Sequence, residues 1–149
     1  MRLLGHPIHP MLVHFPVVFW TVAVGAYVAA AFGVEKAAEV AKLSNGVGLI
    51  MAGLAMIAGL VELRAIDDAS EAMRVATRHM MVMATAWLCF MLALVLTAAA
   101  GIDPATAQVA GALFAAAGFL LMGTGGWLGG RLVYEFGVGV GVRSHAKRR

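Results

Sequence analysis

Four stretches of the chain contain no Asp, Glu, Lys or Arg, and this feature constrains the fold more than any other. A membrane-spanning helix needs about 20 mostly apolar residues, whereas a strand of a membrane barrel is shorter and alternates in polarity. None of these stretches alternates. We therefore predict an all-α integral membrane protein, folded as an antiparallel four-helix bundle. The stretches are Leu3–Val34, Leu43–Val61, His79–Ile102 and Pro104–Gly130.

The composition supports a membrane class for the whole chain. Hydrophobic residues make up 62% and charged residues 13% of the 149 residues, and the mean hydropathy is +0.88. Soluble domains are about half apolar and about a quarter charged. We predict a single four-span transmembrane domain over residues 1–149, with spans at about 10–33, 42–64, 76–101 and 104–130. The first stretch is long and is preceded by a single arginine, Arg2, so we expect a retained span and not a cleaved signal peptide.

Lys and Arg residues are distributed unequally between the two sides of the membrane. Nine fall on the side of the N-terminus, the connection between spans two and three, and the C-terminal tail, and two fall on the opposite side, at Lys36 and Lys42. Cytoplasmic segments of membrane proteins are enriched in positive charge. We predict a multi-pass membrane protein with both termini in the cytoplasm.

Several functional classes are disfavoured by the same sequence. The net charge of +3 comes from residues that flank the spans, so no basic patch suggests a nucleic-acid partner. Cys89 is the single cysteine, which excludes an intrachain disulfide and a CxxC site. No serine or cysteine is spaced as a nucleophile beside a base. We expect an electron carrier or a binding protein more than an enzyme, with the lipid bilayer, a redox partner and an oligomer as its associations.

Local signals predict where the helices begin. Asp103–Pro104 provides an N-cap followed by proline at the first helical position. Asp68 with Glu71 resembles a capping box and predicts a helix from near Ala69. His6 and His9 each precede a proline, which favours an extended segment at both, and Pro16 predicts a kink shortly after His14.

Histidines gather on the predicted cytoplasmic side. His14 lies about one turn inside the first helix and His79 begins the apolar part of the third, so both are expected at similar depth. A b-type haem takes two axial nitrogens from helices that face each other. We predict a membrane electron-transfer protein that binds haem b through His14 and His79, with His9 and His6 as further candidates. Arginines that could pair with the propionates are Arg64, Arg74, Arg78 and Arg131.

Two alternatives use the same residues. Met11, Met80, Met81 and Met83 lie near the histidines, and copper(I) favours thioether and imidazole ligands, so His14 and His79 could instead hold a metal ion. The protein would then be a non-catalytic accessory subunit whose histidines are structural or bind copper. A proton or ion relay through the histidines, Glu62 and Glu135 is less favoured, because no inverted repeat and no charge at mid-membrane is visible.

The whole chain resembles a family of bacterial membrane proteins called domain of unknown function 2231. The resemblance rests on Gly5-His6-Pro7-Ile8-His9-Pro10 through Pro16, on His79, and on the glycine-rich segment Gly125–Tyr134 with Gly137–Val140. It implies that His6, His9 and His79 are the histidines of the family and that Glu62 is the acidic residue that ends its second span. It also implies a location in the bacterial inner (cytoplasmic) membrane. His14 matches only some members. Other members resemble fusions to Rieske-type iron–sulfur domains, which implies a redox setting, although this chain has no cysteine–histidine pattern for such a domain.

Overall fold

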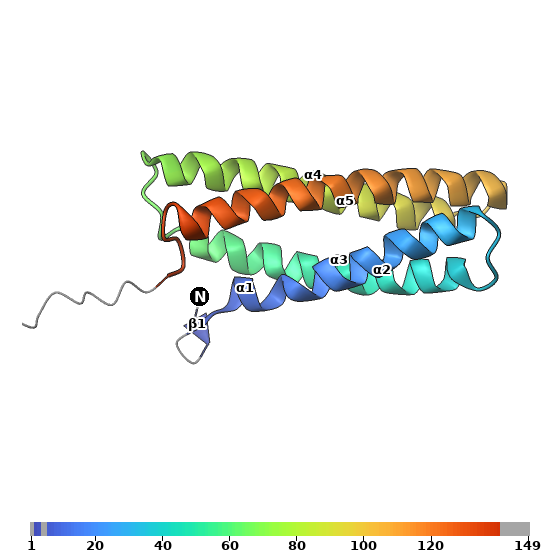
Figure 1. Cartoon of the computed structure of the whole chain (residues 1–149), viewed down its shortest axis with the longest axis horizontal. Coiled ribbons are helices and arrows are strands. Elements are labelled where there is room, and N and C mark those ends of the chain that lie inside the picture. Colours follow the sequence, from blue (N-terminus) through green and yellow to red (C-terminus); the bar gives the residue numbers. More distant parts are fainter. Residues whose placement is uncertain (1, 4–5, 141–149) are drawn as a thin grey trace, which may run out of the picture.

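Four long helices lie side by side in the computed structural model, which describes residues 2–3 and 6–140 (Figure 1). Each helix runs antiparallel to its neighbour in the chain, and each is long and apolar enough to cross a membrane. The predicted all-α four-helix bundle is confirmed. The helices are α2 (His14–Ala31), α3 (Ala37–Leu63), α4 (Glu71–Ala98) and α5 (Pro104–Tyr134).

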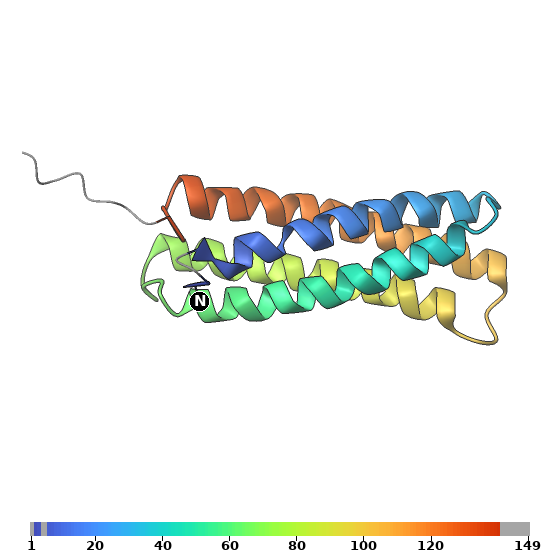
Figure 2. The ribbon, with the colours of Figure 1, turned by 90° about the horizontal axis from the view of Figure 1, so that it is seen from below.

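A short segment precedes the bundle. Strands β1 (Arg2–Leu3) and β2 (His6–Pro7) pair antiparallel, and α1 (Ile8–Leu12) then leads into α2. Helix α1, the loop 64–70 and residues 135–140 all lie at one end of the bundle, which we call the α1 end (Figure 2). The loops 32–36 and 99–103 form the opposite end.

The break between α1 and α2 has a local cause. Proline has no N–H, so Pro16 cannot donate to the carbonyl of Leu12, and the helix is interrupted at Val13. The interruption lies one residue before His14, whereas the kink was predicted shortly after it. The extended conformation predicted for His9 is wrong, because His9 lies inside α1. Pro10 falls in the first turn of that helix, where a missing N–H costs nothing, so the helix accommodates the His9–Pro10 pair.

Two side chains cap the helices that follow the loops. The Asp103 carboxylate accepts from the N–H of Thr106 at 2.9 Å at the start of α5, as predicted. The cap predicted at Asp68 is wrong. Ser70 is the N-cap of α4, and its hydroxyl oxygen accepts from the N–H of Met73 at 3.1 Å. Both Asp68 and Ser70 are residue types that suit a cap, so the choice depends on how the loop enters the helix.

Small residues hold the four helices together. Alanines and glycines dominate the buried positions, and large apolar side chains point outward, as expected where lipid covers the outside. The largest buried side chains occupy the middle of the bundle. Trp20 of α2 and Phe90 of α4 stack with ring centroids 4.3 Å apart and planes 8° apart. Asn45 of α3 lies beside them and donates to the hydroxyl oxygen of Tyr27 at 3.0 Å and to the carbonyl of Phe90 at 2.8 Å.

Candidate functional site: a histidine pair at the α1 end

His9 is held in place by helix α3. Its Nδ1 lies 2.7 Å from the carbonyl oxygen of Ala55. Gly59, one turn further along α3, has no side chain to displace the imidazole. A methyl group at Gly59 would lie 3.2 Å from His9 Nδ1, closer than side chains normally approach. The small residue at 59 therefore permits the contact between the His9 ring and the backbone of α3.

His79 is held in the same manner by helix α5. Its Nδ1 lies 2.8 Å from the carbonyl oxygen of Gly125. Gly129, one turn further along α5, leaves room for the ring, and a methyl group there would lie 3.3 Å from His79 Cε1. The half-buried imidazole is thus fixed by one backbone carbonyl and one bare stretch of helix.

These two half-buried imidazoles lie close to each other at the α1 end. Their ring centroids are 6.3 Å apart and their planes are perpendicular, at 89°. A carbonyl oxygen only accepts hydrogen bonds, so Nδ1 of each ring carries a hydrogen and donates it. In the neutral imidazole this leaves the lone pair on Nε2. A histidine that binds a metal through one nitrogen commonly donates the other N–H to a carbonyl or carboxylate in this way.

The other predicted ligands are placed differently. His14 is the first residue of α2 and its side chain is exposed, and the ring contact of His79 within residues 8–140 is with His9. The backbone of His6 lies in β2. The structure therefore brings His79 together with His9 and does not bring it together with His14.

The predicted arginines all lie at the α1 end, but they are not alike. Arg64, Arg74 and Arg78 have exposed side chains. The Arg131 guanidinium forms an ion pair with Glu135 at 2.7 Å and lies 5.4 Å from the centre of the Trp127 ring. Its hydrogen bonds hold the pKa of the Glu135 carboxyl below the ordinary value. Arg64 and Arg78 are therefore better placed than Arg131 to receive a new carboxylate.

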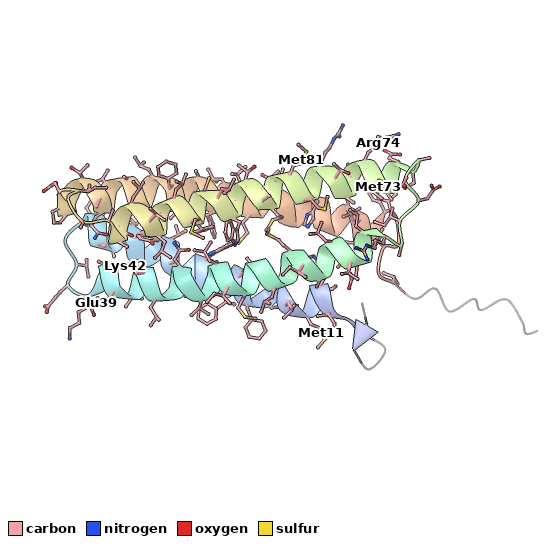
Figure 3. All side chains as sticks on the ribbon, turned by 180° about the vertical axis from the view of Figure 1, so that it is seen from behind. Met11, Glu39, Lys42, Met73, Arg74 and Met81 are labelled. Atoms are coloured by element: carbon pink, nitrogen blue, oxygen red, sulfur yellow. The ribbon has the colours of Figure 1, made fainter. Side chains whose placement is uncertain are left out.

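Of the four methionines predicted as copper ligands, Met11 and Met81 point outward, whereas Met80 and Met83 are half-buried. Met11 and Met81 are 52% and 66% exposed, and Figure 3 shows them on the outside of the bundle. Within the described part of the chain, no group of three or more His, Cys, Asp and Glu side chains could hold a metal ion. The arrangement suits a metal centre that takes two ligands from the protein and its remaining ligands from a cofactor.

Sequence reasoning missed the groups that orient the two imidazoles. The carbonyls of Ala55 and Gly125 carry no signal in the sequence, because every residue has one. Gly59 and Gly129 do carry a signal: each follows its histidine at the same distance along the chain. That equal spacing is the one feature from which the His9–His79 pair could have been recognised.

Comparison with known proteins identifies the family of the chain. No curated protein and no solved structure matches it. The family model for a predicted membrane protein, DUF2231, matches residues 5–142, which include both histidines, the two glycines and all four spans. The chain belongs to this DUF2231 family of predicted membrane proteins.

Proposed function

We propose that the chain is a membrane electron carrier that binds haem b between His9 and His79. The observation that carries the proposal is the spacing of the two rings. Metal–imidazole bonds are about 2 Å long, so a metal bound by Nε2 of two opposed imidazoles separates their ring centroids by about 6 Å. The observed separation is 6.3 Å. His9 replaces His14 as the partner of His79 in this proposal.

Each part of the site has a defined task. The carbonyls of Ala55 and Gly125 keep hydrogen on Nδ1, so that Nε2 is the ligand atom of both rings. Arg64 and Arg78 stand at the rim, where a guanidinium binds a carboxylate such as a propionate in a bidentate manner. Haem, if held by His9 and His79, would supply one-electron chemistry.

The protein would exchange electrons at the α1 end. This end also carries most of the Lys and Arg residues, and we place it in the cytoplasm of a bacterium on that ground. A reporter that is active only in the cytoplasm tests the orientation. It should be active when fused after residue 149 and inactive when inserted in the loop 32–36, and the reverse result would contradict the orientation.

A reduced-minus-oxidised visible spectrum tests the function. The protein is purified in mild detergent from haem-replete cells, and a low-spin haem b spectrum near one haem per chain is expected. His9→Ala and His79→Ala should each abolish it, and His14→Ala, the matched control in the same segment, should retain it. Circular dichroism and gel filtration verify that each variant is folded.

Other outcomes would contradict the proposal. A colourless wild-type protein would exclude haem as the ligand, and loss of the spectrum in His14→Ala but not in His9→Ala would restore His14 as the ligand. Two imidazoles also suit copper(I), which accepts two-ligand sites. Copper found by metal analysis of a colourless protein, and lost in His9→Ala and His79→Ala, would favour the accessory copper protein instead.

A further inference from the structure

The contacts of His9 recur 70 residues further along the chain at His79. Each histidine binds through Nδ1 to the carbonyl of a residue 46 positions after it. Each ring also lies against a glycine one turn beyond that carbonyl, at 59 and at 129. The ligand and its two supports therefore have the same relative positions in the first and second halves of the chain.

The same offset relates the aromatic pair in the middle of the bundle. Trp20 and Phe90 stack on each other, and each also lies against a glycine. A methyl group at Gly48 would lie 2.5 Å from the Trp20 ring, and one at Gly118 would lie 2.9 Å from the Phe90 ring. Gly48 and Gly118 are themselves 70 positions apart. The 70-residue correspondence therefore extends from the histidines at the α1 end into the middle of the bundle.

Burial follows the same offset where the residue types differ. Most buried positions in the first half have buried counterparts in the second, as in the pairs Pro16 and Ala86, Ala41 and Gly111, and Ala52 and Met122. Helix α2 packs on α3 and α5, and α4 packs on the same two helices. The corresponding helices, α2 with α4 and α3 with α5, therefore lie diagonally across the bundle. A two-fold axis along the bundle relates such an arrangement.

We infer that residues 8–65 and 78–135 are two copies of one helix-pair unit around a two-fold pseudo-axis, and that His9 and His79 are equivalent ligands of one centre on that axis. Gly59 and Gly129 are then equivalent positioning residues. The ligand belongs to the class of metal centres that accept two neutral nitrogens on opposite sides. The identification of this centre as haem rests on the proposed function. The equivalence of the two imidazoles does not.

The glycines allow a matched test in the full-length protein. Gly59→Ala places a methyl group against the His9 ring and Gly129→Ala places one against the His79 ring. Gly53→Ala and Gly123→Ala are the controls, because they lie on the same two helices, are also related by the 70-residue offset, and have nothing within 4 Å of the added carbon. Each test variant should move its own imidazole and leave the other in place.

Nitrogen NMR of ¹⁵N-histidine-labelled, ligand-free protein in detergent measures this directly. His9→Gln and His79→Gln assign the resonances, and both rings should carry hydrogen on Nδ1, which donates to a carbonyl in each case. Gly59→Ala should shift the resonances of His9 and Gly129→Ala those of His79, by similar amounts. Neither control should shift either ring. Different tautomers for the two rings, or glycine variants that move both rings or neither, would overturn the equivalence.

Titration with hemin separates this inference from the proposed function. Loss of an orienting contact typically weakens binding of a metal about 10- to 100-fold. Gly59→Ala and Gly129→Ala should therefore weaken hemin binding by similar factors in this range, and the controls by less than about twofold. Matching NMR results in a protein that does not bind hemin would refute haem and leave the paired site standing. Weakening by only one of the two glycine variants would refute the equivalence.

Discussion

The aromatic stack at the centre of the bundle leads to a quantitative prediction for Gly48→Ala and Gly118→Ala. Carbon atoms pack best at about 3.5–4.0 Å, so a methyl group at Gly48, 2.5 Å from Trp20 Cδ1, forces the ring back by about 1 Å. At Gly118 the nearest Phe90 carbons lie at 2.9 Å, and the displacement is about 0.6 Å. Neither ring can retreat freely, since Trp20 and Phe90 are fully buried and stack on each other.

Overpacking of this kind costs about 1–3 kcal/mol of unfolding free energy, so we expect Gly48→Ala near the top of that range and Gly118→Ala lower. Replacing glycine by alanine also favours a helix by up to about 1 kcal/mol. Gly53→Ala and Gly123→Ala carry that gain without the clash, and the difference between each variant and its control isolates the packing effect. Unfolding by SDS in mixed micelles, followed by tryptophan fluorescence, measures it. Equal stability of Gly48→Ala and Gly53→Ala would refute the packing described here.

Three further predictions concern polar contacts. Tyr27→Phe removes one acceptor of Asn45 and should lower the unfolding free energy by about 0.5–1.5 kcal/mol, measured by the same SDS titration; an unchanged stability would contradict the hydrogen bond. Ser70→Ala removes the N-cap of α4 and should cost about 1 kcal/mol, whereas Ser70→Asp should retain most of the stability. Hydrogen bonds from Thr106 hold the pKa of Asp103 below its ordinary value. The stabilisation from this carboxylate is therefore present above the ordinary pKa of about 3.9 and is lost as the pH falls through the lower pKa of the folded state. Thermal midpoints of wild type and Asp103→Ala should accordingly differ at neutral pH and converge in acid, and a constant difference would contradict the shift.

The internal repeat shows why part of this structure is difficult to find in the sequence. Few residues are identical between the halves, although His9 and His79, Gly48 and Gly118, and Gly59 and Gly129 are. Other corresponding positions, such as Pro16 and Ala86, share only a buried location, which different residue types can fill. Lipid and core are both apolar, so the sequence pattern does not separate an inward residue from an outward one.

The sequence by itself determined the four spans, the start of α5 at Asp103–Pro104 and the end of the bundle at which the histidines gather. These features depend on local chemistry: a helix satisfies its own backbone in lipid, and uncharged stretches of sufficient length can only be helices there. The tertiary structure alone decided that His79 faces His9 and not His14. Depth along a helix follows from sequence position, but the face that a side chain occupies depends on how the helix packs. In helices that are apolar on all sides no periodic pattern marks that face, and here the bare backbone at Gly59 and Gly129 leaves room for the two rings.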